Sequence, residues 1–333
     1  LRKSHRVAVF EMGISDFHEL ENLTSISQPQ IGYLTTIGSA HLEKLGGADG
    51  VLKAKRELFD WIAEHATERT LVFNLDNPHL EKLHTEFLAR KTTGLRLITV
   101  SQHKANADVR LVKKQPLGLE HRYGWAYTFE TPWGTIQGTL PLPGTHNLAN
   151  AMAAATLALA TGKTAIKDVI AGLEQSQVSK MRSDLFRTQN GAVIYNDSYN
   201  ANPTSVSALF EAAQDIRKNA AAGLSKTIAV VGDMLELGQN SAELHRQMGR
   251  LAAQDGVDVL LATGTFAQFW VEGFREQKRL SGGTAALAFP NQQELIEALS
   301  DEVRGRPSET LVLVKGSRGA KMDLIVDHIR KTY

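Results

Sequence analysis

The sequence predicts an α/β fold in two domains, a mixed-sheet domain followed by a doubly wound domain built on a parallel sheet. Three observations lead to this prediction. In the second half of the chain, short apolar runs alternate with helical patterns, which is typical of a parallel sheet covered by helices. Between residues 108 and 142, apolar and polar residues alternate instead, as in antiparallel hairpins. The 333 residues are enough for two domains that each bury a core.

The second half of the chain is regular. Each apolar run is short, and the segment after it carries the apolar spacing of a helix. The expected strands cover residues 192–195, 227–231, 257–262, 285–289 and 310–314. The expected helices cover residues 204–217, 241–254, 266–275, 292–303 and 322–330. We therefore predict a Rossmann-like carboxyl-terminal domain over residues 184–333.

The first half of the chain is mixed. Strands are expected at residues 7–10, 31–37, 70–73 and 95–100. Helices are expected at residues 49–63, 147–160 and 165–175. The change of pattern around residues 176–183 indicates a linker, so the first domain is expected to span residues 1–183.

Composition limits the classes of function. The formal net charge is +1, which gives no reason to expect nucleic acid or an acidic membrane surface as a partner. Cysteine is absent, so disulfides and thiolate metal sites are excluded, and a cytoplasmic location is expected. No apolar run reaches the roughly 18 residues that a membrane-spanning helix needs. The chain begins at Leu1 and runs at once into the strand expected at residues 7–10, so we expect a preceding segment that this sequence does not include.

Two polar residues follow neighbouring strands expected in the first domain. Glu11 comes directly after residues 7–10, and His41 follows the strand at residues 31–37. Parallel strands end at one edge of a sheet, where a carboxylate and an imidazole can hold a metal ion and nucleotide phosphates. Taken alone, His41 also fits a loop histidine with a backbone hydrogen bond.

Lys55 lies within an apolar stripe of the helix expected at residues 49–63. Val51, Leu58 and Ile62 share its face of the helix. A lysine in such a stripe extends its amine to solvent, finds a partner, or loses its charge. A neutral amine is a nucleophile that is open to modification. The sequence leaves these interpretations open.

A polar cluster follows the strand expected at residues 192–195. Asp197, Ser198, Asn200 and Asn202 stand between this strand and the next helix, which is where open α/β sheets bind ligands. Asn202, followed by proline, also fits the cap of that helix. The cap leaves Asp197, Ser198 and Asn200 as candidates for ligand binding.

Two asparagines three positions apart open the helix expected at residues 147–160. Asn147 and Asn150 share its amino-terminal face, where amide donors and acceptors can read the edge of a heterocycle. Capping explains Asn147 equally well. The nearby Gly-Lys-Thr at residues 162–164 is not a phosphate loop, because the first glycine of that pattern is replaced by Leu157.

Two more polar loops follow expected strands of the second domain. One covers residues 232–238, and the other begins at Lys315 and includes Ser317 and Arg318. The second loop offers two cations and main-chain amides to an anion, and a helix follows it. Several polar loops at one edge of one sheet are expected to form a single site.

Together these motifs resemble those of the Mur ligases. The resemblance covers essentially the whole chain and rests on Glu11-Met-Gly13, His41-Leu-Glu43, Lys53-Ala-Lys-Arg-Glu-Leu-Phe59, Gly144-Thr-His-Asn-Leu-Ala-Asn150, Asp197-Ser-Tyr-Asn-Ala-Asn-Pro203, Gly232-Asp-Met-Leu-Glu-Leu-Gly238 and Lys315-Gly-Ser-Arg-Gly319. It implies that the first domain is a central ATPase-type domain, truncated at its amino end. The implied activity is ATP-driven amide formation through an acyl phosphate, which adds D-alanyl-D-alanine to a UDP-N-acetylmuramoyl-tripeptide in peptidoglycan precursor synthesis.

The resemblance also implies roles for individual residues. The catalytic set would be Glu11, His41, Lys55 and Arg182, in which Glu11, His41 and a carbamylated Lys55 hold Mg²⁺. The residues implied to bind ATP are Asn147 and Asn150 at the adenine, Asp197 at the ribose and Arg182 at the transferring phosphate. The residues implied to hold the dipeptide are Ser198, Asn200, Asn202, Lys315, Ser317 and Arg318. The implied protein is a cytoplasmic monomer.

The sequence departs from the family pattern in places. Relatives carry a UDP-sugar-binding domain and a phosphate loop before the position of Glu11, and this sequence contains neither, so the chain alone is expected not to hydrolyse ATP. Ser15-Asp16 stands where many relatives have Asn-His, and Met181 stands where a glycine usually precedes the arginine. The alternatives are another Mur ligase, a ligase like folylpolyglutamate synthase, or a non-catalytic fragment that binds nucleotide or peptide. A nucleotide-binding oxidoreductase is disfavoured, because no G-x-G-x-x-G follows a strand.

Overall fold

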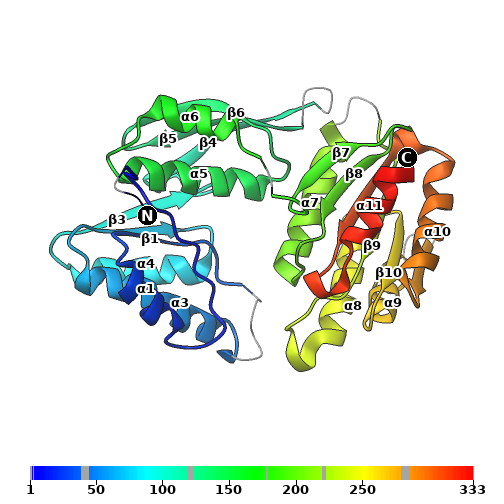
Figure 1. Ribbon diagram of the computed structural model, residues 1–333, viewed down its shortest axis with the longest axis horizontal. Coiled ribbons are helices and arrows are strands. Elements are labelled where there is room, and N and C mark those ends of the chain that lie inside the picture. Colours follow the sequence, from blue (N-terminus) through cyan, green and yellow to red (C-terminus); the bar gives the residue numbers. More distant parts are fainter. Residues whose placement is uncertain are drawn as a thin grey trace. The chain divides into compact units, whose positions relative to one another are not determined.

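The structure is a computed structural model that describes residues 2, 4–38, 45–118, 123–177, 179–219, 223–278 and 285–332. The chain forms two compact units, each of which is described by itself (Figure 1). Unit 1 comprises Leu1–Gln115, Trp125–Pro141 and His146–Ser176, and unit 2 comprises Pro116–Gly124, Leu142–Thr145 and Gln177–Tyr333. The domain boundary expected at residue 183 stays a prediction.

Unit 1 is built on a mixed sheet. Within the described residues its strands lie in the order β1-β2-β3-β4-β5-β6. They cover Ile31–Leu34, Arg69–Asn74, Leu95–Ser101, Val109–Leu117, Gly124–Thr131 and Gly134–Leu140. The first four strands pair in parallel, whereas β5 and β6 form the antiparallel hairpin that the alternating sequence predicts. Gly134 begins β6 at φ 127°, a backbone conformation that suits glycine.

The helices of unit 1 pack on this sheet or on one another. They are α1 (Glu19–Ser27), α3 (Ala48–His65), α4 (Pro78–Arg90), α5 (Thr145–Ala160) and α6 (Ile166–Glu174). Among them, α1 packs on α3. Phe59 of α3 meets Phe73 of β2 and Phe87 of α4 edge to face, which joins both helices to the sheet in one core. Helices between some of the strands were expected, but α1 and α4 were not located. Asn77 caps α4 by accepting the N–H of Leu80 at 3.3 Å.

The prediction of a strand at residues 7–10 is wrong. This segment is irregular, and its apolar side chains face solvent, with Val9 90% exposed and Phe10 52% exposed. A strand needs a neighbour to satisfy its backbone donors and acceptors, and among the described residues β1 pairs only with β2. The strand expected at residues 31–37 is present but ends early, at Leu34.

Unit 2 is built on a second sheet, whose described strands lie in the order β11-β10-β9-β12-β8-β7. In that order they cover Ala285–Phe289, Val259–Thr263, Lys226–Val231, Thr310–Lys315, Val193–Asp197 and Asp184–Arg187. All pair in parallel except β7, which runs antiparallel to β8. Every residue of β12 is buried, as expected for a central strand with helices on both faces.

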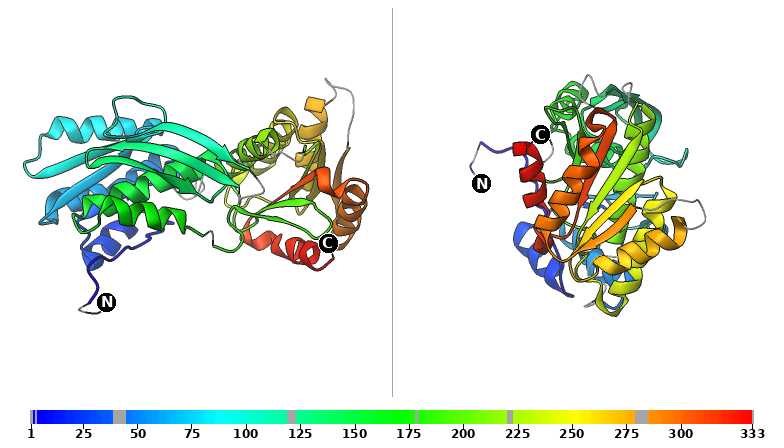
Figure 2. Two further views of the ribbon diagram at one scale, coloured as in Figure 1. Left: turned by 90° about the horizontal axis from the view of Figure 1, so that it is seen from above. Right: turned by 90° about the vertical axis from the view of Figure 1, so that its right-hand side faces the viewer.

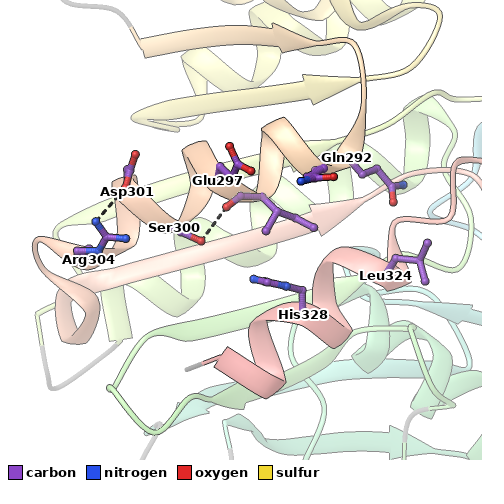
Figure 3. Close-up of a pocket in the computed structure, with 9 residues that line it drawn as sticks. Gln292, Glu297, Ser300, Asp301, Arg304, Leu324 and His328 are labelled. Atoms are coloured by element: carbon purple, nitrogen blue, oxygen red, sulfur yellow. Dashed lines mark hydrogen bonds and ion pairs between the residues drawn. The ribbon is translucent and has the colours of Figure 1, made fainter.

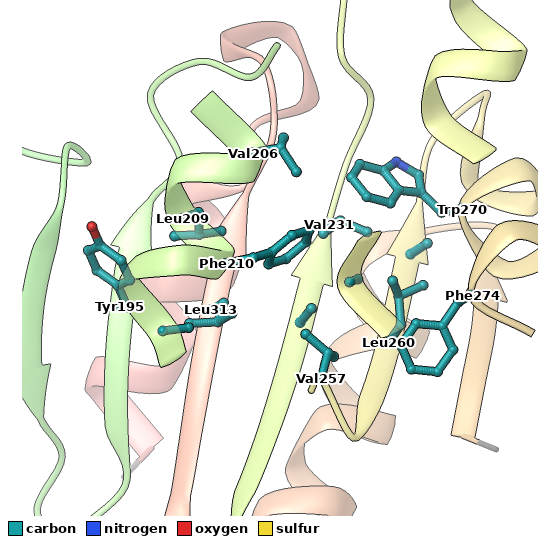
Figure 4. Packing of buried hydrophobic residues seen from close by; sticks show 14 of the residues in the cluster. Tyr195, Val206, Leu209, Phe210, Val231, Val257, Leu260, Trp270, Phe274 and Leu313 are labelled. Carbon is teal, nitrogen blue, oxygen red and sulfur yellow. The ribbon is translucent and has the colours of Figure 1, made fainter. Parts of the chain in front are cut away.

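The helices of unit 2 cover both faces of its sheet. They are α7 (Pro203–Asn219), α8 (Ser241–Gln254), α9 (Ala267–Lys278), α10 (Gln292–Arg304) and α11 (Asp323–Thr332). α7, α8 and α9 share a core around Phe210, Trp270 and Phe274 (Figure 4). α10 and α11 build a separate core on the opposite face (Figure 2). The doubly wound, Rossmann-like fold is confirmed, with strands and helices within a few residues of those expected. Among the described helices, none is long and apolar enough to span a bilayer.

Candidate functional site

Three central strands of unit 2 end together. Lys315, the last residue of β12, is in register with Asp197 at the end of β8 and with Val231 at the end of β9. The loops that follow these strands therefore start at one edge of the sheet. Open α/β sheets bind their ligands at this edge.

The ammonium group of Lys315 is held inside this edge. Its Nζ donates to Oδ2 of Asp197 at 2.6 Å, to the Asp197 carbonyl at 3.2 Å and to the Asn200 carbonyl at 2.6 Å. Burial lowers the pKa of Lys315, and the Asp197 carboxylate opposes that shift. Because these bonds use all three protons of the ammonium, Lys315 fixes the loop that follows β8.

Asp197 is also joined to the segment that precedes β7. The main-chain N–H of Ser183 donates to Oδ1 of Asp197 at 3.0 Å. The guanidinium carbon of Arg182 lies 4.0 Å from the ring centroid of Tyr199. The N–H of Tyr199 donates in turn to the carbonyl of Met181 at 3.0 Å. Residues 181–183 and the loop after β8 therefore form one connected piece.

Ser317 connects three of the loops. Its hydroxyl accepts the N–H of Leu235 at 2.9 Å and donates to the carbonyl of Ala201 at 3.3 Å. Its own N–H donates to the carbonyl of Asp233 at 2.9 Å. The hydroxyl of this buried residue is paired on both sides, so Ser317 acts in this structure as a link between loops.

Asp233 extends the network to the loop after β10. From sequence, it was placed in the polar loop at residues 232–238 but was assigned no role of its own. Its Oδ2 accepts the N–H of Thr265 and its Oδ1 accepts the N–H of Phe266, each at 2.9 Å. Asp233 follows the end of β9 much as Asp197 ends β8. That position, an acidic residue just past the end of a buried strand, is the signal that would have assigned it a role.

His245 supports the same loop from α8. Its Nε2 accepts the N–H of Met234 at 2.9 Å, and its Nδ1 lies 2.6 Å from the carbonyl of Ser241. The imidazole must therefore be neutral with its proton on Nδ1. Burial lowers the pKa of His245, which favours that state. A lone histidine inside a helix gives no sequence signal for this role.

The other polar residues after β8 make local hydrogen bonds. The hydroxyl of Ser198 donates to Oδ1 of Asn196 at 2.7 Å, and Oδ1 of Asn200 accepts the next main-chain N–H at 2.8 Å. Oδ1 of Asn202 accepts the N–H of Ser205 at 2.9 Å. The helix cap that the sequence offered as one interpretation of Asn202 is therefore present.

Arg318 is the exposed cation of the loop after β12. Its guanidinium pairs with Oδ2 of Asp323 at 3.1 Å, and Nη1 also lies 3.2 Å from Sδ of Met181. Met181 directly precedes Arg182, so this contact connects the loop after β12 to the segment that carries a second exposed arginine. Such a pair of cations suits an anionic ligand.

Lys55 lies on α3 in unit 1. Val51, Leu58 and Ile62 are buried beside it, which confirms the expected apolar stripe. Its Nζ donates to the carbonyl of Thr36 at 2.8 Å, in the segment that follows β1. Burial lowers the pKa of Lys55, so a larger fraction of this amine is neutral at a given pH than for an ordinary lysine.

The structure describes only one of the two other expected metal ligands. Glu11 is exposed in the irregular segment and does not end a strand. His41 lies outside the described residues. In the described ranges, no group of three or more histidine, aspartate and glutamate side chains could hold a metal ion. The metal site therefore stays a prediction.

Asn147 and Asn150 lie in the first turns of α5. Nδ2 of Asn150 donates to Oδ1 of Asn147 at 3.3 Å. Asn147 is buried, whereas Asn150 is exposed. The two amides are thus on one face of the helix, as their spacing predicts, and Asn150 is the accessible member.

A groove of about 680 Å³ lies elsewhere on unit 2, between α10 and α11 (Figure 3). Its lining includes Ile296, Asp301, Arg304 and His328. Asp301 and Arg304 pair with each other at 3.2 Å along α10. The groove contains none of the strand-end residues, so it is separate from the candidate site.

Comparisons with known proteins agree with this fold. Residues 1–158 match the family model of the Mur ligase middle domain, and residues 181–318 match that of the Mur ligase, glutamate ligase domain. The UDP-N-acetylmuramoyl-tripeptide–D-alanyl-D-alanine ligase of Escherichia coli is 30% identical over 328 residues, which are 98% of this chain and 66% of that protein.

Solved structures give the same relationship. The crystal structure of MurF from Acinetobacter baumannii has a TM-score of 0.83 at 28% identity and covers 100% of this chain and 66% of that one. MurF ligase from Thermotoga maritima, in complex with ADP, shares the fold with a TM-score of 0.73 at 21% identity, over 95% of this chain and 65% of that one. The chain spans 63 to 66% of the length of the curated relatives that it matches along nearly its whole length. Two matching family models, the shared fold and this similarity establish that the chain belongs to the Mur ligase family.

Proposed function

We propose that this chain is the nucleotide- and amine-binding part of a ligase that joins D-alanyl-D-alanine to a UDP-N-acetylmuramoyl-tripeptide at the expense of ATP. The observation that carries the proposal is the edge of the unit 2 sheet, where Asp197, Lys315 and Ser317 join the strand-end loops. These residues belong to motifs that resemble this member of the family, and the Escherichia coli relative is named for the reaction. The proposed setting is peptidoglycan precursor synthesis, by a cytoplasmic monomer.

The reaction needs two displacements at charged groups. The tripeptide carboxylate attacks the γ-phosphate of ATP, ADP leaves, and an acyl phosphate forms. The dipeptide amine then attacks the acyl carbon, phosphate leaves, and the amine loses a proton. A protein accelerates such steps by positioning and by charge neutralisation. We assign the transferring phosphate to Arg182 and the dipeptide carboxylate to Arg318, the two exposed cations beside Met181.

The nucleotide is assigned to two asparagines and one aspartate. Asn147 and Asn150 are proposed to read the adenine, since their amides lie together at the start of α5. Asp197 is proposed to bind the ribose hydroxyls. Its carboxylate already accepts bonds from Ser183 and Lys315, and each carboxylate oxygen retains a further lone pair for a hydroxyl donor.

The cofactor is proposed to be Mg²⁺, held by Glu11, His41 and a carbamylated Lys55. An ammonium group cannot bind a cation, so the fit of Lys55 to this role depends on the modification. The lowered pKa of Lys55 supports it, because only the neutral amine can add CO₂. When bound, Mg²⁺ neutralises charge on the phosphate oxygens.

The dipeptide site is proposed to be shaped by residues whose hydrogen bonds hold the strand-end loops in place. Lys315 and Ser317 hold the loops in place, and Asn202 fixes the start of α7. Ser198 and Asn200 set the course of the loop between them. These residues are therefore proposed to act on the dipeptide through the shape of the site, because their hydrogen bonds commit them to the loops that form it.

Calorimetry with Mg·ADP tests the nucleotide part of the proposal on the chain itself. Binding of one nucleotide per chain is expected. Asn150→Ala should weaken it by about 5- to 30-fold, since a lost hydrogen bond to a ligand costs about 1 to 2 kcal/mol. Asp301→Ala, in the exposed pair on α10, is the matched control and should bind normally. No binding by the folded chain, or binding indifferent to Asn150, would remove the nucleotide assignment.

A further inference from the structure

Arg182 lies between two residues with a left-handed backbone. Met181 has φ 68° and Ser183 has φ 50°, a region that side chains other than glycine avoid at a cost of about 1 to 3 kcal/mol each. Two hydrogen bonds hold this conformation. The N–H of Tyr199 donates to the carbonyl of Met181, and the N–H of Ser183 donates to Asp197, both at 3.0 Å. The backbone that presents Arg182 is therefore fixed from the loop after β8.

The side chain of Arg182 is held from the same loop. Its guanidinium carbon lies 4.0 Å from the ring centroid of Tyr199, within the range of a cation–π contact. The ring is 41% exposed, so burial of Tyr199 does not explain its position. Asp197, which accepts the N–H of the adjacent Ser183, is already paired with Lys315. The guanidinium therefore rests on an aromatic face.

We propose that Tyr199 is a positioning residue for Arg182, which it holds ready for the transferring phosphate through both its ring and its main chain. The inference rests on the proposed function, which assigns the phosphate to Arg182, and it names the residue that sets the geometry. A guanidinium that stacks by its face keeps its edge N–H donors directed at phosphate oxygens. An arginine that is already ordered also loses less conformational entropy when the anion binds.

The test compares two ligands by calorimetry on the full chain, ADP and the non-hydrolysable β,γ-imido analogue of ATP. The affinity for the analogue divided by the affinity for ADP reports on the γ-phosphate alone. Tyr199→Leu removes the aromatic face and is expected to lower this ratio by about 2- to 5-fold, the strength of an exposed cation–π contact. Tyr199→Phe keeps the face and should restore the ratio. In an Arg182→Ala background, Tyr199→Leu should have no further effect.

A matched control exists in the same unit. Phe186 of β7 lies under the guanidinium of Arg330 of α11 at 4.2 Å, so this contact involves neither Arg182 nor Tyr199. Phe186→Leu removes a stack of the same kind and should leave the ratio of affinities unchanged. The NMR signal of the Arg182 Nε–H gives a ligand-free reading, because loss of the ring current in Tyr199→Leu should shift it while the rest of the spectrum is retained.

The outcomes separate the inference from the proposed function. If Arg182→Ala lowers the ratio and Tyr199→Leu does not, Tyr199 does not position the arginine, and the phosphate assignment stands. If Tyr199→Leu lowers the ratio equally without Arg182, the tyrosine acts by another route and the inference is overturned. If neither variant changes the ratio, the phosphate assignment of Arg182 fails, and the inference fails with it.

Discussion

The Nζ atom of Lys315 lies 2.6 Å from Oδ2 of Asp197, at a point where the lysine side chain is only 3% exposed. A buried ion pair of this kind contributes little relative to apolar residues of the same size, because both charges lose their hydration. Removal of one partner is a different matter, since the remaining charge is then buried without compensation. The loss of one partner of the Lys315–Asp197 pair should therefore be measurable as a fall in the free energy of unfolding.

Asp197→Ala is expected to lower the free energy of unfolding of unit 2 by about 3 to 5 kcal/mol, because it leaves the Lys315 ammonium with carbonyl partners only. Lys315→Met should cost less, because Asp197 is a fifth exposed and keeps its bond from Ser183. The double variant should cost less than the sum of the two. Urea denaturation of the four proteins gives the coupling energy, and additive costs would show that the pair is not energetically linked.

Asn202→Ala tests whether this residue is only a cap. Its Oδ1 accepts the N–H of Ser205, and loss of such a cap costs about 1 kcal/mol. Asn291 caps α10 through the N–H of Glu294 in the same way, so Asn291→Ala is the matched control and should cost a similar amount. A loss of affinity for D-alanyl-D-alanine in Asn202→Ala that Asn291→Ala does not share would show that Asn202 also contacts the dipeptide.

His245 should make the stability of unit 2 depend on pH. Burial lowers its pKa in the folded chain below the ordinary value of 6.5, whereas in the unfolded chain it titrates near that value. Below about pH 6.5 the unfolded state then binds more protons, so the free energy of unfolding should fall as the pH falls toward the folded-state pKa. Stability should be fully present above about pH 7.

His245→Gln isolates this contribution. Glutamine at this position does not titrate. The free energy of unfolding of the variant should therefore change less between neutral and mildly acidic pH than that of the unaltered chain. Asp233 is the acidic group that acts on His245, and it remains in place. His18→Gln replaces an exposed histidine and serves as the control. Equal pH slopes in the unaltered chain and in His245→Gln would contradict the assignment of a neutral buried imidazole.

Lys55 should be the lysine of α3 that reacts with CO₂. Its pKa is lowered by burial, so in mildly alkaline ¹³C-bicarbonate a carbamate signal is expected by ¹³C NMR. The signal should disappear in Lys55→Arg and weaken as the pH is lowered, because protonation removes the nucleophile. Lys53→Arg changes an exposed lysine of the same helix and should leave the signal intact. A signal that survives Lys55→Arg would place the modification elsewhere.

The second half of the fold could be predicted closely from sequence. Its strands are buried on both faces and therefore read as continuous apolar runs, and the residues expected for α8 are those of the structure. The edge strand β7 was missed, because it is short and half-buried. The prediction of a strand at residues 7–10 was wrong for a related reason. Its apolar residues suggest a strand, but strand formation depends on a partner that local sequence does not reveal.

The candidate site was predictable in place but not in detail. The polar strand ends of β8 and β12 meet at one sheet edge because parallel strands share a direction, and this much follows from the sequence. The contacts of Ser317 with Ala201 and of Asp233 with Thr265 join residues far apart in the chain. No local pattern predicts which of two polar groups is saturated inside the protein and which faces a ligand. Lys315 and Arg318 show the difference, since one is buried and the other exposed.

The most direct test of the proposed reaction replaces the matching part of the Escherichia coli ligase with this chain. The folded chimera is given ATP, UDP-N-acetylmuramoyl-tripeptide and either D-alanyl-D-alanine or a single amino acid, and the product is weighed by mass spectrometry. The account predicts a product extended by the dipeptide, with ADP and phosphate released in equal amount. A folded chimera that extends its substrate only with a single amino acid, or that forms no product, would contradict it.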